Sequence, residues 1–296
     1  MKFDRFARRK YFSNGMAVLT GLAIVAIMVP LAAVIYETVL LGGSVFNVDL
    51  FTKGIPQPCT PLAGVTCQQG GLVVPIEGSI LLMGLSALFS VPIGIGAAIF
   101  AVEYAGERKS ARIVGIVADV LSGVPSIVAG AFIYALIVVY DPTIVFSTLS
   151  GSLALAVIMI PIVTRTCEEA LRTVPNSVRE AALALGISRW KTTLRIVLVS
   201  ALPGIVTGVL LAVARAAGEA APLLILLGNG CEHPLQGLSQ EGCALPLWIY
   251  VGATSSSQNL VNLAWGAALL LLLLILVLSI ASRLTLDRLA RRMRGE

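Results

Sequence analysis

One arginine and one glutamate lie inside the apolar run of residues 209–227. Arg215 and Glu219 are four positions apart, so in a helix their side chains share one face and partly neutralise each other. A guanidinium group keeps its charge at physiological pH and binds oxyanions through two parallel N–H donors. The pair therefore predicts one of two things. It is either an anion station in which Glu219 is the resting partner of Arg215, or an ion pair that fixes helix packing.

The composition places this pair in a membrane protein. Of the 296 residues, 57% are hydrophobic and 12% are charged, whereas soluble domains carry about 25% charged residues. A membrane helix needs roughly 20 mostly apolar residues. We therefore predict an all-α, polytopic membrane protein, a single domain over residues 1–296 with six transmembrane helices. The spans are expected at about 16–40, 77–102, 113–140, 150–166, 201–227 and 260–282.

The basic residues predict the orientation of these spans. If the N-terminus lies inside, every lysine and arginine except Lys53 and Arg215 falls in an inside segment, and such residues stay on the cytoplasmic side. We expect a multi-pass protein of the cell (inner) membrane with both termini in the cytoplasm. The net charge of +5 then reflects topology and anionic lipid head groups, not a nucleic-acid partner.

The fifth span carries the charged pair close to the bilayer centre. Arg215 lies about 14 residues beyond the start of that span, or roughly 21 Å into the membrane. A lone charge there costs about 2.5–3.5 kcal/mol, so the pair must face protein or a wet cavity. Pro222 lacks an amide hydrogen and leaves the carbonyl of Gly218 without its helical donor. We expect a helix break at Gly218 and Pro222 that lines a pathway.

The third span adds two further pathway candidates. Asp119 precedes the run Ser-Gly-Val-Pro-Ser at 122–126, which interrupts a helix and ends at Ser126. The carboxylate and the hydroxyl are candidates to line the same path as Arg215. The alternative is that the small residues of this run only allow close helix packing.

The one long inside loop, residues 165–200, is predicted to form two short helices around a glycine. Ser177 and Glu180 have the spacing of a capping box at the start of the first helix. Gly186 can take the left-handed conformation that ends it. The loop presents a small apolar surface with basic residues around it, suited either to the groove of a partner protein or to the membrane surface.

The cysteines predict disulfides on the outer side. Cys59 and Cys67 precede the second span, and Cys231 and Cys243 precede the sixth. Two disulfides are expected because that compartment is oxidising, with the pairing left open; four free thiols are the alternative.

Several stretches resemble the A-type permease of phosphate-specific ABC importers. The sequence EAALALG at 180–186 matches the EAA---G core of the loop in permeases of bacterial-type ABC importers, with Val199 where the pattern has a proline. Ala220 stands where the permease usually has a threonine. The other stretches are VPIGIGAAIFAVEYA (91–105), SGVPSIVAG (122–130), EEALRTVPNSVREAALALG (168–186) and PGIVTGVLLAVARAAGEAAPLL (203–224).

This resemblance implies a type I ABC importer permease fold and a set of partners. A short coupling helix would seat in a cytoplasmic ATPase dimer, a second, C-type permease would complete the pathway, and an external binding protein would deliver phosphate. Arg215 would be a phosphate station. The coupling residues would be Glu180, Ala181, Ala182 and Gly186.

The chain itself is predicted to be a transport subunit and not an enzyme. It has no nucleophile–base set and no metal-ligand spacing. No lysine follows a glycine, so the G-x-x-x-x-G-K-[ST] phosphate-binding loop is absent from the sequence. We expect no cofactor on this chain, with ATP and Mg²⁺ used by the separate ATPase.

Two alternatives stay open. The cargo can be another oxyanion, such as molybdate, tungstate or phosphonate, because the binding protein largely chooses the substrate. The chain can also be a stand-alone secondary transporter, although such proteins often show internal repeats and none is evident here.

Overall fold

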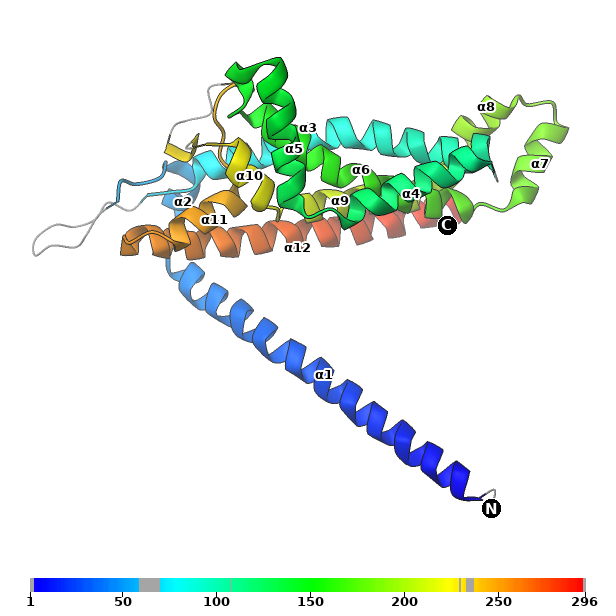
Figure 1. The fold of residues 1–296 in the computed structure, drawn as a ribbon, viewed down its shortest axis with the longest axis horizontal. Helices are drawn as coiled ribbons and strands as arrows, with labels where there is room; N and C mark the ends of the chain where they lie inside the picture. Colours follow the sequence, from blue (N-terminus) through cyan, green and yellow to red (C-terminus); the bar gives the residue numbers. More distant parts are fainter. Residues whose placement is uncertain (1–2, 59–69, 107, 229, 233–236, 295–296) are drawn as a thin grey trace, which may run out of the picture.

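The computed structural model describes residues 3–58, 70–106, 108–228, 230–232 and 237–294 (Figure 1). Within these ranges the chain forms helices and no strand. The α-helices are α1 (Phe3–Ser44), α2 (Val48–Thr52), α3 (Val73–Ile99), α4 (Lys109–Gly123), α5 (Ser126–Tyr140), α6 (Thr148–Arg172), α7 (Asn176–Ala184), α8 (Arg189–Thr192), α9 (Leu198–Ala216), α10 (Ala221–Leu226), α11 (Leu245–Ala253) and α12 (Gln258–Arg294). The π-helical segments η1 (Phe100–Ala105) and η3 (Thr193–Val197) extend α3 and precede α9, and the 3-10 turns are η2 (Pro142–Ile144) and η4 (Gly230–Glu232).

Five continuous helices are long and apolar enough to cross a membrane, and one bent pair makes a sixth. The five are Arg8–Ser44, Val73–Ala105, Thr148–Arg172, Arg189–Ala216 and Gln258–Thr285. The pair is α4 and α5, which meet at 104°. An all-α membrane protein with up to six spans, as predicted from the sequence, is confirmed.

Three predicted spans differ from the observed helices in ways that matter for the site. The span predicted at 113–140 is broken at Val124 and Pro125, since a residue before proline is driven out of the helical conformation. The span predicted at 201–227 is interrupted between Ala216 and Ala221. In addition, α6 continues to Arg172, so the loop predicted to start at 165 begins as helix.

Helix α6 is the buried centre of the bundle, and small residues let its neighbours approach. A Cβ atom at Gly208 of α9 would lie 2.2 Å from Oγ1 of Thr166, and one at Gly94 of α3 would lie 2.7 Å from Cγ1 of Val163. Small residues allow this backbone approach between membrane helices, where no hydrophobic force pulls helices together. α6 therefore presents side chains to both α3 and α9.

Helix α1 departs from the bundle. It contacts α12 at its C-terminal end, where a Cβ at Gly42 would lie 2.6 Å from the carbonyl oxygen of Trp265, while its apolar length is exposed (Figure 1). The helices α7 and α8 lie at the same end of the molecule as the C-terminus, and α2, α10 and α11 lie at the other end (Figure 1).

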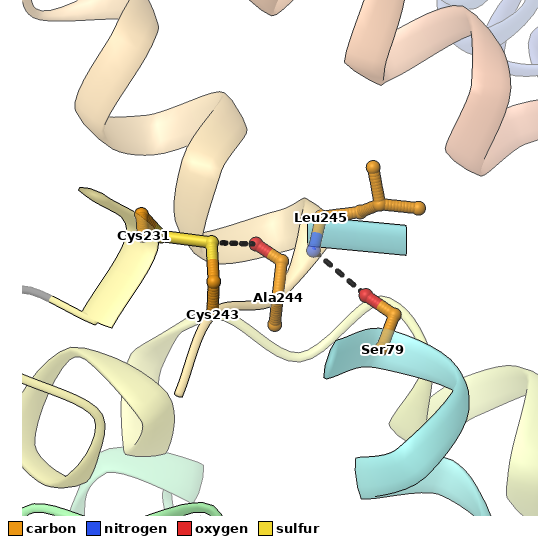
Figure 2. The surroundings of a disulfide bond; sticks show 5 residues. All are labelled: Ser79, Cys231, Cys243, Ala244 and Leu245. Carbon is orange, nitrogen blue, oxygen red and sulfur yellow. Dashed lines mark hydrogen bonds between the residues drawn. A yellow bond between two sulfur atoms is a disulfide. The ribbon is translucent and has the colours of Figure 1, made fainter. Parts of the chain in front are cut away.

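A disulfide links two residues of the segment that precedes α11. Cys231 and Cys243 are bonded, and the next residues are anchored to α3 because the amide of Leu245 donates to Oγ of Ser79 at 2.7 Å (Figure 2). Cys59 and Cys67 lie outside the described residues.

Candidate functional site

The two interrupted spans meet around a cavity of about 450 Å³. The break between α4 and α5 supplies one wall and α6 another. The end of α9 and the break that follows supply Arg215 and Glu219. The lining residues are Leu121, Ser122, Val124, Pro125, Ser126, Val128, Ala129, Phe132, Val157, Ile158, Ile162, Arg215 and Glu219.

The second break is built by backbone turns next to the charged pair. The amide of Gly218 donates to the carbonyl of Arg215 at 3.1 Å, and the amide of Glu219 donates to the carbonyl of Ala216 at 3.1 Å. Pro222 lies in the first turn of α10, where a missing amide hydrogen removes no helical hydrogen bond. Gly218 thus lies in the break, and Pro222 is the second residue of the helix that follows it.

The two breaks are held together by a close backbone contact. A Cβ atom at Gly130 of α5 would lie 2.7 Å from Cα of Pro222 in α10. Only a glycine lets α5 and α10 pack this tightly, so this contact fixes the position of the two breaks around the cavity.

Arg215 is open toward the cavity. Its Nε lies 3.9 Å from Oε1 of Glu219, which is beyond hydrogen-bond distance, and the exposed fractions of the two side chains are 58% and 19%. The guanidinium makes no hydrogen bond to another of the described residues. Its donors are therefore available to an anion, with a carboxylate close enough to balance the charge when the cavity holds none.

Of the predicted pathway residues, Arg215, Glu219 and Ser126 line this cavity, whereas Asp119 faces a second one. Asp119 pairs with Arg165 of α6: Nε of Arg165 donates to Oδ1 at 2.9 Å, and Nη2 contacts Oδ2. Arg165 also donates to Glu168 at 2.8 Å and to the carbonyl of Gly115 at 2.7 Å. The role of Arg165 was missed by sequence analysis, which placed it at the end of a span among the inside basic residues.

The second cavity, of about 590 Å³, is basic. It lies where α4 and α6 meet the end of η1, and its arginines are Arg108, Arg112, Arg165 and Arg172, with Asp119 and Glu168 as its carboxylates. It lies toward the α7 end of the bundle, whereas the first cavity lies at the breaks.

The loop between α6 and α9 forms the two expected short helices. Gly186 has φ +75°, so the left-handed helix end is confirmed. The capping box is wrong: Pro175 is the N-cap of α7 and makes no side-chain cap, which places Ser177 inside the helix. Of the other motif residues, Ala182 is buried while Glu180 and Ala181 are exposed. Leu183 and Leu185 add apolar surface at the exposed end of α7.

Comparison with known proteins gives a consistent picture. The family model described as "binding-protein-dependent transport system inner membrane component" matches residues 90–295. The phosphate transport system permease protein PstA of Xylella fastidiosa is 40% identical over 82% of this chain and 81% of its own length. That of Haemophilus influenzae is 37% identical over 95% of both chains.

Solved structures share the fold. A chain of the inward-facing MetNI methionine ABC transporter aligns with a TM-score of 0.60 at 18% identity, over 73% of this chain and 96% of its own. A chain of a bacterial alginate ABC transporter, solved with an alginate-bound periplasmic protein, aligns with a TM-score of 0.63 at 14% identity, over 97% and 96%. The type I ABC importer permease fold predicted from the sequence is thereby confirmed.

Proposed function

Because this chain belongs to the family of binding-protein-dependent transport system inner membrane components, we propose that it is the membrane-spanning A-type permease of an ATP-driven importer that moves inorganic phosphate into the cytoplasm. The observation that carries this proposal is the accessible guanidinium of Arg215, which lies 3.9 Å from Glu219 in a cavity between two broken spans.

The site supports passage of an oxyanion rather than its permanent capture. Arg215 offers a two-pronged donor set to a phosphate oxygen pair, and its charge persists at every physiological pH. The carboxylate of Glu219 competes with phosphate for the same guanidinium, which keeps phosphate binding weak enough for release. Conduction requires this balance between entry and exit. Ser126 adds a hydroxyl to the same cavity.

The remaining parts of the importer follow from the family and from the exposed surfaces of this chain. A cytoplasmic ATPase dimer would receive α7, whose exposed end carries Leu183 and Leu185. A C-type permease would complete the pathway, and an external binding protein would deliver phosphate. Both termini would lie in the cytoplasm, on the side of α7. The remaining apolar surface, including that of α1, would meet lipid or the second permease.

Phosphate is favoured over other oxyanions because the similar curated relatives are phosphate transport system permeases. A stand-alone transporter is disfavoured by the family model.

The experiment is ATP-dependent uptake in proteoliposomes that contain this chain, the second permease, the ATPase and the binding protein. We expect uptake of labelled phosphate that requires all four components. An excess of unlabelled molybdate should not reduce this uptake. Uptake by this chain without the ATPase, or a complex that carries molybdate and not phosphate, would contradict the proposal.

A further inference from the structure

Glu103 is a buried carboxylate outside both cavities, and its charge is balanced from the loop that carries the EAA motif. Its exposed fraction is 7%. Nη2 and Nε of Arg179, in α7, donate to Oε1 of Glu103 at 2.6 and 3.0 Å. The Arg179 side chain is itself 17% exposed. Two charge-assisted hydrogen bonds make this pair directional, and removing either partner would leave a buried charge uncompensated.

Arg179 also holds the end of α6. Its Nη1 donates to the carbonyl of Val174 at 2.6 Å, and its Nη2 donates to the carbonyl of Leu171 at 3.0 Å. One side chain thus joins three elements: α7, the C-terminal end of α6, and η1 through Glu103. Val102 of η1 and Val178 of α7 pack against the same buried cluster, so the polar link lies beside a continuous apolar contact.

The other short helix of the loop reaches the same point. Nη2 of Arg189, in α8, donates to the backbone carbonyl of Glu103, and its guanidinium lies 5.7 Å from the ring centroid of Tyr104. The two helices that flank Gly186 therefore both attach to Glu103, α7 through the carboxylate and α8 through the backbone carbonyl.

The segment to which they attach leads directly to the broken span. η1 is a π-helical segment, a geometry that occurs mostly in single turns and often at functional sites. After Gly106, at φ +55°, the amide of Arg108 donates to the carbonyl of Ala105 at 3.0 Å, and α4 begins at Lys109. α4 ends at the break that lines the Arg215 cavity, so a single helix connects η1 with that cavity.

We propose that Arg179 and Glu103 are positioning residues that transmit movement of α7 to η1 and α4, and thereby to the cavity that contains Arg215. The inference rests on the proposed function, because it requires a partner ATPase that moves α7. Without the pair, α7 still docks on its partner, since Arg179 faces inward and the apolar tip of α7 does not depend on it. The movement then reaches the pathway incompletely.

The test compares Glu103→Gln and Arg179→Gln with a matched control, Arg195→Gln, in the reconstituted four-component importer. Arg195 is an exposed arginine of the same loop that makes no ion pair within the described part of the chain. We expect Glu103→Gln and Arg179→Gln to co-purify with the ATPase and to hydrolyse ATP at close to the wild-type rate. Phosphate moved per ATP should fall severalfold in both variants, because hydrolysis continues while the movement of α7 no longer reaches the pathway in full. Arg195→Gln should keep the wild-type ratio.

A distance measurement separates transmission from simple stability. Spin labels on exposed positions of α5 and α12, at Val139 and Val277, should change separation when a non-hydrolysable ATP analogue binds the wild-type complex. A second pair, at the exposed Ser177 in the first turn of α7 and at Val277, reports α7 itself. In Glu103→Gln, the distance between the α7 label and the α12 label should still change when the analogue binds. The distance between the α5 label and the α12 label should no longer change. An unchanged phosphate-to-ATP ratio in both variants, or no α5 change in wild type, overturns the inference.

If a glutamine variant fails to assemble, Glu103→Asp and Arg179→Lys are tested instead, because they retain the charges and change only the geometry of the pair. Complexes of these variants that assemble must still show a lower ratio of phosphate moved to ATP hydrolysed. Loss of assembly, hydrolysis and uptake together in these conservative variants shows a purely structural pair and overturns the inference. Failure of the proposed function is recognised separately, because the wild-type complex would then take up no phosphate.

Discussion

Arg215, in the last turn of α9, and Glu219, in the break that follows, have Nε and Oε1 3.9 Å apart in the cavity formed by the two helix breaks. The distance is short enough for each charge to lower the cost of the other, and too long for a hydrogen bond that an anion would have to break. An arginine in this state is charge-compensated and still able to receive a ligand.

Replacing Arg215 by glutamine removes the charge and keeps most of the side-chain volume. We expect phosphate uptake by the reconstituted importer to fall by about tenfold or more, since a hydrogen bond to a charged group contributes about 1.5–3 kcal/mol. Arg215→Lys keeps the charge but loses the two parallel N–H donors, so its uptake rate should lie between those of wild type and Arg215→Gln. The measurement is initial uptake rate beside ATPase activity. Wild-type uptake with coupled hydrolysis in Arg215→Gln would show that the pair serves packing alone.

Glu219→Gln should have the opposite effect on binding. Without the competing carboxylate, the guanidinium holds phosphate more tightly, so phosphate occupancy of the isolated complex should rise while turnover falls. Binding of labelled phosphate to detergent-solubilised complex, followed by chase with unlabelled phosphate, measures both. Weaker binding in Glu219→Gln would assign the carboxylate to the binding site itself.

The turn at Gly186 is tested by Gly186→Ala. No atom lies within 4 Å of a Cβ at this position, so the penalty comes from φ +75° and not from crowding. A left-handed residue other than glycine costs about 1–2 kcal/mol, which corresponds to roughly a tenfold loss in affinity for the ATPase. Gly84→Ala is the control, because Gly84 lies in helical α3 with equal space around it. Equal ATPase co-purification for the two variants would contradict this expectation.

Gly130→Ala tests the contact between the two breaks. The new methyl would lie 2.7 Å from Cα of Pro222, so α5 and α10 must separate at a cost of about 1–3 kcal/mol. We expect a lower thermal-unfolding midpoint and reduced phosphate uptake. Gly96→Ala, with nothing within 4 Å, provides the comparison and should be neutral or slightly stabilising. A midpoint for Gly130→Ala as high as that of Gly96→Ala would show that the two helices can separate freely.

Removal of the disulfide should destabilise the end of the molecule that carries α11. Cys231 and Cys243 are 12 positions apart, and a bridge over a loop of this size contributes about 2–4 kcal/mol. The double variant Cys231→Ala/Cys243→Ala should therefore melt at a lower temperature, and reducing agent should lower the melting temperature of wild type as well. An unchanged midpoint in the double variant would mean that the anchor of Leu245 on Ser79 holds this region alone.

Local features of this protein were readable from the sequence because they depend on short stretches of chain. A membrane helix satisfies its backbone hydrogen bonds internally, so a long apolar run is sufficient to predict it. The helical period predicted that Arg215 and Glu219 lie close together, which they do although Glu219 lies in the break after α9. A glycine after a helix predicts the left-handed end found at Gly186. The motifs of the middle of the chain were also sufficient to indicate the family.

Local patterns gave weaker guidance on helix ends and breaks. Pro125 and Pro222 each indicated an interruption of a span. The angle of the first bend, 104°, and the position of Pro222 in the first turn of a helix depend instead on the neighbouring helices. The expected capping box at Ser177 failed because the helix starts earlier: Pro175, two residues before Ser177, is the N-cap and Asn176 is the first helical residue.

Charge pairing was decided by the tertiary structure. Asp119 meets Arg165, 46 positions away, and Glu103 meets Arg179, 76 positions away. Sequence spacing specifies which residues share a helix face, but a partner on another helix is chosen by how the helices cross and by the cost of leaving a buried charge unpaired. The sequence by itself therefore determined the membrane helices and the charged pair of the fifth span. Only packing around α6 decided which breaks meet to form the cavity, and which carboxylate each arginine contacts.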